Sequence, residues 1–328
     1  MKKYICIQVI LICSSLLIPT QAHAYKYGLG SCLDQSLDQV IWPAVQKENL
    51  DGFIFLGDNV YGDRPDGKLS KMKKAYEIQK TKLPKWLMED KEILAIWDDH
   101  DFGLNDGGNN YINKDEAKKI FLNFWDIAGN DPRNFREGLY FKKKKYIDET
   151  EIEIIALDTR YFRSKLNGKK NAYRPNIDPK ATILGTKQWN WFESSIANST
   201  ANIIIVLSSI QVLATEHPYE KWANFPLERS KLIKILSNES KNKTIIVVSG
   251  DRHRSGIYQN NHFVEITASS LNKPGSKNQE TDPFLINQTF SEINYGILDI
   301  QPKQDRITVS IHNQKGQELN SRIINIRE

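Results

Sequence analysis

The stretch Ile93–Asn110, ILAIWDDHDFGLNDGGNN, constrains the fold more than any other part of the sequence. It opens with an apolar run of the length of a buried strand and then changes at once to Asp98, Asp99, His100 and Asp101. A glycine-rich segment follows. No basic residue lies within this cluster of carboxylates, so their mutual repulsion costs free energy unless a cation offsets it. The pattern therefore predicts a strand whose carboxyl end holds a metal ion.

Two further apolar runs end in a similar way. Phe53–Leu56 runs into a GDNVYGD segment, and Thr244–Ser249 runs into GDRHRSG. A single Gly-Asp pair after a strand is commonly a turn, because Asp caps backbone groups and Gly accepts a positive φ. Three such strands in one chain instead indicate one polynuclear metal site at the rim of a sheet.

These polar segments resemble the metal-binding segments of the PhoD-like alkaline phosphatase D family, a branch of the calcineurin-like metallophosphoesterases. Further segments agree with the family in the same order: GSC at Gly30–Cys32, LDTRYFRS at Leu157–Ser164, LGTKQWNWFE at Leu184–Glu193 and WANFPLER at Trp222–Arg229. The resemblance covers most of the chain that follows the N-terminal segment. It implies an α/β fold, a four-layer α/β/β/α sandwich in which two packed mixed β-sheets are flanked by helices.

The resemblance also implies a centre that holds Fe³⁺ and Ca²⁺, with other divalent metals as alternatives. Its ligands in this sequence are Cys32, Asp58, Tyr61, Asn105, Asp251 and His253. A thiolate and a phenolate are electron-rich ligands that suit a ferric ion, and carboxylate and amide oxygens suit Ca²⁺. Cys32 is the only cysteine after residue 24, so it is either such a ligand or a buried small hydrophobic residue. Most calcineurin-like enzymes carry Asp-x-His at the GSC position, and its absence here favours the PhoD branch.

Other residues of these segments are candidates for catalysis and substrate binding. His100 can hydrogen-bond a phosphoryl oxygen, protonate the leaving group or hold a metal ligand in place by a hydrogen bond. Asp99 can orient the His100 ring. Arg160 suits a phosphate clamp, because a guanidinium holds two phosphoryl oxygens in one plane, and an ion pair with a surface carboxylate is the alternative. Asn59 and Arg252 are the other expected substrate-binding residues. The isolated histidines are expected to be structural: His217, His262 and His312.

Phosphate esters are stable anions, and bound metal ions overcome this by screening charge and activating water. We therefore expect a phosphoric ester hydrolase that acts on monoesters or diesters, by attack of a metal-activated hydroxide. One alternative is a phosphodiesterase of the phospholipase type that acts on teichoic acid or phospholipid. The other is an inactive metal-binding relative, which the retained polar residues disfavour. The formal charge of +5, or +3 without Lys2 and Lys3, gives no reason to expect a nucleic-acid partner. We expect a monomer acting on small-molecule, lipid or polymer phosphate esters.

Residues 1–24 have the pattern of a signal peptide. A basic start precedes the apolar run Tyr4–Ile18, and Ala22 and Ala24 are the small residues that a signal peptidase requires. An uncleaved membrane anchor is the alternative, although the run is short for a span. Residues 25–328 show no composition break, linker or repeat, so we expect one PhoD-like domain, exported to the periplasm or secreted, with no transmembrane segment.

Hydrophobic periodicity predicts where helices and strands lie. Helices are expected over Leu37–Lys47, Ser70–Lys82, Lys114–Ile127, Gly185–Asn198 and Pro226–Leu236. Further strands are expected over Tyr25–Gly30, Ile203–Ser208, Phe263–Thr267, Gly296–Ile300 and Arg306–His312. Leu139–Phe141 and Ile152–Leu157 are expected to form a hairpin joined by a charged turn region over Lys142–Glu151. Lys273–Asp282 is expected to be a polar surface loop.

Overall fold

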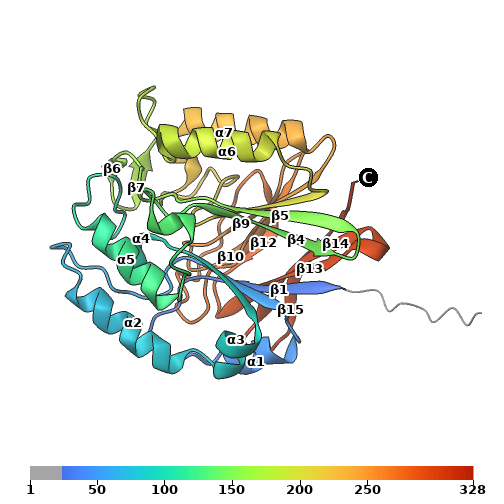
Figure 1. Cartoon of the computed structure of the whole chain (residues 1–328), viewed down its shortest axis with the longest axis horizontal. Coiled ribbons are helices and arrows are strands. Elements are labelled where there is room, and N and C mark those ends of the chain that lie inside the picture. Colours follow the sequence, from blue (N-terminus) through green and yellow to red (C-terminus); the bar gives the residue numbers. More distant parts are fainter. Residues whose placement is uncertain (1–23, 328) are drawn as a thin grey trace, which may run out of the picture.

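The computed structural model describes residues 24–327, so the predicted signal peptide lies outside the described residues except for Ala24. Two large β-sheets pack against each other, and helices cover their outer faces (Figure 1). The first sheet has the strand order β15-β14-β13-β1-β2-β3, and the second has the order β12-β10-β11-β9-β8-β5-β4. Both sheets mix parallel and antiparallel pairs. The predicted α/β/β/α sandwich is therefore confirmed.

The first sheet places three parallel strand ends at one edge. Its strands are β1 (Tyr25–Gly30), β2 (Gly52–Leu56), β3 (Glu92–Ile96), β13 (Asn294–Gln301), β14 (Arg306–Asn313) and β15 (Glu318–Asn325). Since β1, β2 and β3 run parallel, the segments that follow them begin side by side. The helices of this half are α1 (Trp42–Lys47), α2 (Ser70–Lys82), α3 (Lys85–Asp90), α4 (Asp99–Phe102) and α5 (Lys114–Phe124).

The second sheet also contributes parallel strand ends. Its strands are β4 (Phe141–Ile147), β5 (Thr150–Ala156), β8 (Ile203–Ser208), β9 (Thr244–Ser249), β10 (Ser255–Gln259), β11 (Val264–Thr267) and β12 (Leu285–Phe290). Helices α6 (Gly185–Ala197) and α7 (Pro226–Glu239) cover this half in Figure 1. A small separate hairpin consists of β6 (Asn167–Lys169) and β7 (Ala172–Arg174). Single 3₁₀ turns occur at Pro132–Asn134, Trp222–Asn224 and Pro302–Gln304.

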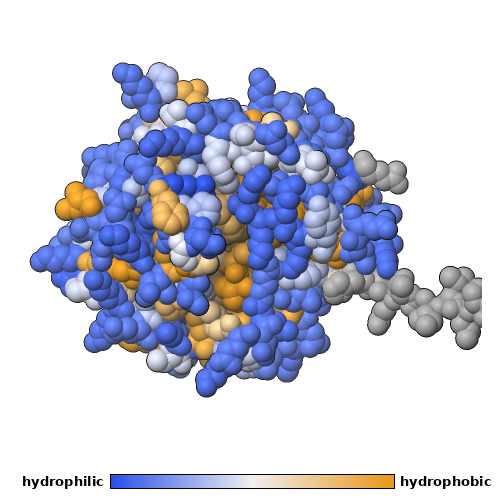
Figure 2. Space-filling model, in the orientation of Figure 1, coloured by the Kyte–Doolittle hydropathy of each residue, from blue (hydrophilic) through white to orange (hydrophobic). Residues whose placement is uncertain are grey.

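Alternation along each strand divides the apolar side chains between two faces. In β2, Ile54 and Leu56 face the other sheet, whereas Phe53 and Phe55 pack under the helices of the first half. Strands covered on both faces read as continuous apolar runs, which is why their positions could be predicted. On the face in Figure 2, hydrophilic residues cover most of the surface, apart from an apolar strip near its centre. Among residues 24–327, no helix is both long and apolar enough to cross a membrane.

Most of the predicted elements are confirmed within a few residues, but the first helix is shorter than expected. It begins at Trp42 rather than at Leu37. Pro43 lies in its first turn, where the missing backbone N–H costs nothing. Leu37 and Val40, which lie before the helix, are exposed.

The predicted charged turn over Lys142–Glu151 is wrong, because its lysines belong to strand β4. Each of these lysines pairs with a carboxylate of β5 in the same sheet or of β3 in the other sheet. The pairs are Lys142 with Glu153, Lys143 and Lys145 with Glu92, and Lys144 with Glu151. The run is thus part of the sheet edge and not a free basic patch.

Candidate metal centre

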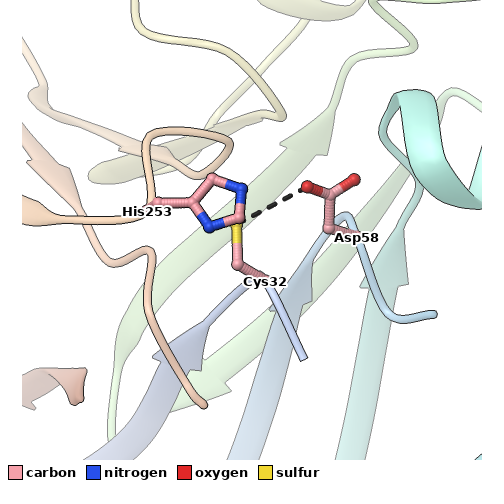
Figure 3. A group of neighbouring side chains, drawn as sticks. All are labelled: Cys32, Asp58 and His253. Atoms are coloured by element: carbon pink, nitrogen blue, oxygen red, sulfur yellow. Dashed lines mark hydrogen bonds between the residues drawn. The ribbon is translucent and has the colours of Figure 1, made fainter. Parts of the chain in front are cut away.

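The strand ends of the two sheets bring the predicted metal ligands together at one edge of the molecule. Cys32 follows β1, Asp58 follows β2, and Asp99 begins α4 just after β3. Asp251 and His253 follow β9 of the other sheet. Figure 3 shows Cys32, Asp58 and His253 directed toward one another from three separate segments of the chain. The arrangement follows the general rule that sites in α/β folds form beyond the carboxyl ends of the strands.

One side of the centre carries the softer donor atoms. Cys32 Sγ lies 3.5 Å from Asp58 Oδ2, and the Tyr61 hydroxyl lies 3.4 Å from the same oxygen. The Tyr61 hydroxyl is also 3.3 Å from His253 Nε2. Single donor atoms of Cys32, Asp58 and His253 all lie within 4.8 Å of one another, which is close enough for one metal ion to contact all three.

The other side of the centre is made of carboxylates. Donor oxygens of Asp58, Asp98, Asp99 and Asp251 also lie within 4.8 Å of one another. Asp58 belongs to both groups, so its carboxylate lies where two ions can share it. Asp99 was predicted only to orient a histidine, and the structure makes it a further candidate ligand.

The backbone is strained where it presents these ligands. Cys32, Asp58, Asp251 and His253 have φ angles of 57°, 52°, 66° and 53°. Residues other than glycine rarely adopt such left-handed conformations, which cost on the order of 1–3 kcal/mol each and gather at functional sites. Strain at four predicted ligands supports a functional rather than a merely structural reading of these turns.

The centre accumulates negative charge away from solvent. Burial raises the pKa of Asp58 well above its usual value, and the neighbouring Cys32 and Asp99 raise it further. Burial likewise raises the pKa of Asp251, with repulsion from other carboxylates added to it. Burial also raises the pKa values of the Cys32 thiol and the Tyr61 phenol. A cation among these groups would reverse each penalty, so the donor set fits a bound metal.

A backbone contact fixes the orientation of His253. Its Nδ1 lies 2.6 Å from the carbonyl oxygen of Lys273, which can only accept a hydrogen bond. Nδ1 therefore carries the proton, and the lone pair of Nε2 faces the centre, where it can accept a hydrogen bond from the Tyr61 hydroxyl. Burial lowers the pKa of His253 to about 4, so the ring is neutral near pH 7, as a metal ligand requires. No sequence pattern pointed to Lys273, which lies on the predicted polar loop.

His100 is held by Asp63 and not, as predicted, by Asp99. The distance from His100 Nδ1 to Asp63 Oδ1 is 2.6 Å, whereas Nε2 is 4.0 Å from Asp99 Oδ1. Burial disfavours a charged His100, but Asp99 and Asp63 together raise its pKa above the usual value. Asp63 is the last residue of the GDNVYGD segment, and its place beside Asp58 in one loop was the signal that could have identified it.

The predicted role of Arg160 as a phosphate clamp needs correction. Its side chain is fully buried and does not line the cavity at the centre. Its Nε donates to Asp98 Oδ1 at 2.6 Å, and its Nη1 donates to Glu220 Oε2 at 2.5 Å. Both carboxylates are buried as well, so the alternative of a surface ion pair is also wrong. Arg160 instead holds Asp98, one of the four clustered carboxylates of the centre, and compensates its buried charge.

Asn59 is also directed away from the expected substrate position. It is buried, and its Nδ2 donates to the carbonyl oxygen of Ile96 at 2.9 Å and to Asp101. Asp101 in turn accepts hydrogen bonds from the backbone N–H groups of Asp58 and Asn59 at 3.3 and 3.1 Å. These two side chains therefore hold the turn that carries Asp58.

The centre opens into a cavity of about 230 Å³. The predicted site residues that line it are Asp99, His100, Asn105, Asp251, Arg252 and His253. Further lining residues, which the sequence did not single out, include Asp106, Lys170, Tyr173, Tyr219, Glu220 and Arg254. The histidines expected to be structural do not line it: His217, His262 and His312. The cavity thus joins the metal centre to one predicted substrate-binding residue, Arg252.

Comparison with solved structures shows that the fold is shared with phosphatases. A structure of PhoD matches with a TM-score of 0.68 and 16% identity over 92% of this chain and 68% of that one. Purple acid phosphatase PPD1 from yellow lupin seeds matches with a TM-score of 0.58 and 13% identity over 93% and 54%. GAP50, the anchor in the inner membrane complex of Plasmodium, matches with a TM-score of 0.59 and 13% identity over 93% and 90%.

The fold is one that phosphatases share, and the residues at its strand ends form groups that could hold a metal ion. More narrowly, the chain belongs to the PhoD-like phosphatase family, whose sequence model matches residues 149–317. It is therefore a phosphoric ester hydrolase, as predicted. No curated protein matches the sequence.

Proposed function

We propose that this chain is an exported, metal-dependent phosphoesterase that hydrolyses phosphate monoesters, diesters or both. The observation that carries the proposal is the position of Asp58. It lies between a thiol–phenol–imidazole group and a carboxylate group, at the strand ends of a PhoD-like fold. A carboxylate in that position suits two metal ions, and two ions a few ångströms apart suit hydrolysis of phosphate esters.

Two sets of residues would hold the metals. Cys32, Tyr61 and His253 suit Fe³⁺, because thiolate, phenolate and imidazole are ligands of a transition metal. Oxygen donors suit Ca²⁺, and they are Asp99, Asn105 and Asp251, with Asp58 shared between the ions. When bound, the metal ions supply positive charge for the phosphoryl oxygens and a strong nucleophile near neutral pH.

The protein residues around the cavity would bind the substrate and move protons. His100 lines the cavity, and its Asp63 partner stabilises the protonated ring, so it can donate a proton to the leaving oxygen. The Arg252 guanidinium lines the same cavity and can bind a phosphoryl oxygen. The buried Arg160 keeps Asp98 in place beside the other carboxylates.

A neighbouring cavity favours diesters with a large second substituent. It measures about 570 Å³ and shares Asn105, Asp106, Lys170 and Tyr173 with the first cavity. A phosphodiester bound at the centre therefore has space for its second group on this side. Teichoic acid and phospholipid are substrates of this kind.

The test is hydrolysis of p-nitrophenyl phosphate and bis(p-nitrophenyl) phosphate by the purified protein, together with elemental analysis. We expect turnover of at least one ester, loss of turnover after chelation and recovery on adding Fe³⁺ and Ca²⁺. A diester rate above the monoester rate would select the phosphodiesterase alternative. Metal-loaded protein that hydrolyses neither ester would instead support the inactive metal-binding relative.

A further inference from the structure

The β6–β7 hairpin carries a lysine at its tip, beside the metal centre. Lys169 pairs with Ala172, so the tip consists of Lys170 and Asn171 alone. Within this turn Asn171 has a positive φ angle of 62°, which Asn tolerates, and Gly168 in strand β6 has a φ angle of 95°. A Cβ on Gly168 would lie 2.6 Å from the carbonyl oxygen of Ala172. The backbone itself therefore determines where Lys170 lies.

The hairpin is attached to two walls of the cavity. The Tyr173 hydroxyl donates to Asp106 Oδ2 at 2.7 Å, and Asp106 follows the predicted ligand Asn105. The Tyr173 backbone N–H donates to the carbonyl oxygen of Pro218 at 3.1 Å, next to Tyr219 of the opposite wall. These contacts hold the hairpin against the centre, so Lys170 is not simply one of many surface lysines.

The ammonium of Lys170 lies at a predicted metal ligand. Its Nζ is 2.8 Å from Asn105 Oδ1. A metal ion at that oxygen would repel the ammonium, so Lys170 must release Asn105 when the ion binds. Its flexible stem lets the ammonium stay nearby. Lys170 is exposed and lines both cavities, which places its charge at their junction.

Two arginines, Arg252 and Arg254, line the first cavity together with Lys170. Both lie near the same carboxylate, Glu280, at 2.5 and 3.4 Å. Within residues 24–327, the buried Nε of Arg252 has no hydrogen-bond partner. Carboxylates of Asp99, Asp106, Glu220 and Asp251 share this lining, and Lys170 is the exposed one of the three cations. Lys170 is therefore the cation that an anionic group of the substrate can reach.

We propose that Lys170 determines specificity for phosphate esters whose leaving group carries a second anionic group, a carboxylate or a further phosphate. The ester phosphate binds at the centre, and the Lys170 ammonium binds the second group at the junction of the cavities. This inference rests on the phosphoesterase function proposed above. It assigns to Lys170 a role in binding and none in bond breaking.

The test compares three aryl phosphates of similar shape: 4-carboxyphenyl phosphate, 4-phosphonophenyl phosphate and the neutral 4-carbamoylphenyl phosphate. The quantity to measure is the ratio of kcat/KM for each anionic ester to kcat/KM for the neutral one. We expect Lys170→Gln to lower this ratio about tenfold, because a charge-assisted hydrogen bond is lost. Lys170→Arg should keep most of the ratio. Lys169→Gln, at an exposed lysine that lines neither cavity, is the matched control and should keep the wild-type ratio.

The possible outcomes separate this inference from the proposed function. An unchanged ratio in Lys170→Gln, or an equal loss for all three esters, would overturn the role of Lys170 and leave the phosphoesterase function standing. Wild-type protein that hydrolyses none of the esters would overturn both. Elemental analysis of each variant is part of the test, because Lys170 touches Asn105. A kcat/KM ratio that falls only in proportion to the metal content would count against the inference. The anionic ester with the higher kcat/KM shows whether the second anionic group is a carboxylate or a phosphate.

Discussion

Four consecutive polar residues at the end of β3 have four different roles. Asp98, Asp99, His100 and Asp101 lie at the start of the short helix α4, where successive side chains are about 100° apart. The first pairs with a buried arginine, the second faces the metal centre, the third lines the cavity, and the fourth holds the turn after β2. One helical turn thus connects the centre to its support.

Substitution of Cys32 tests the metal centre at the residue scale. Cys32→Ser keeps nearly the same volume, so a merely buried thiol should tolerate it with little loss of stability. If the thiolate is an iron ligand, the variant should fold but lose iron, visible absorbance and most of its activity, because a hydroxyl is a poor anion near neutral pH. The measurements are an absorption spectrum, elemental analysis and a phosphatase rate on one preparation.

Tyr61→Phe is the companion variant for the same centre. Loss of a phenolate ligand should change the visible band while the Cys32 contribution remains. If Cys32→Ser has the iron content and activity of wild type, Cys32 is a buried hydrophobic residue and not an iron ligand. The assignment of iron would then rest on family resemblance alone.

At the scale of elements, the sequence was informative where local pattern decides the structure. Buried strands such as Thr244–Ser249 are continuous apolar runs, and their ends are marked by Gly-Asp. Tertiary pairing left no such signal, so the burial of Arg160 could not be predicted, and the only mark of the Asp63–His100 contact was the place of Asp63 in the GDNVYGD segment. The β6–β7 hairpin has mostly exposed three-residue strands, which are too short to show a periodicity. Yet this hairpin forms part of the cavity wall.

An ion-pair cluster at the edge of the sheets allows a prediction about stability. Glu92 of β3 accepts hydrogen bonds from Tyr25 and Tyr27 at 2.5 and 2.7 Å, and it pairs with Lys143 and Lys145 of β4 in the other sheet. Burial opposes its ionisation, but these partners lower the pKa of Glu92 to about 2. Glu92→Gln should therefore destabilise the fold by about 2 kcal/mol near pH 7, allowing for partial exposure.

The sign of this effect fixes its pH dependence. Because the folded-state pKa lies below the unfolded value of 4.5, the stabilisation is complete above about pH 4.5 and is lost as the pH falls toward 2. Urea unfolding of both proteins at several pH values measures the difference. Glu89→Gln, at an exposed position in the adjacent helix, is the control and should cost little at any pH. A Glu92→Gln deficit that stays constant down to pH 2 would contradict the ionic explanation.

For the whole molecule, the export hypothesis predicts where the mature chain begins. Expression in an exporting host should give protein whose intact mass corresponds to cleavage after Ala24, since the apolar run and the small residues match a signal peptidase site. Protein that keeps residues 1–24 in a membrane fraction would support the uncleaved anchor instead.

The substitution Asp58→Asn should change the stability of the whole fold in opposite directions with and without bound metal. Without metal, Asp58 is a buried carboxylate among other acidic groups, so Asp58→Asn removes a repulsion and should raise the melting temperature by about 2–4 °C. With metal bound, the same substitution removes a shared ligand and should lower it, because binding stabilises the folded state in proportion to affinity. Thermal unfolding of wild type, Asp58→Asn and the exposed-site control Asp90→Asn, before and after chelation, measures both signs. A shift in melting temperature of the same sign in both states would mean that Asp58 acts only in its turn. A reversal of sign that occurs in Asp58→Asn and not in the control would show that the fold tolerates this strained, charged position because a cation binds there.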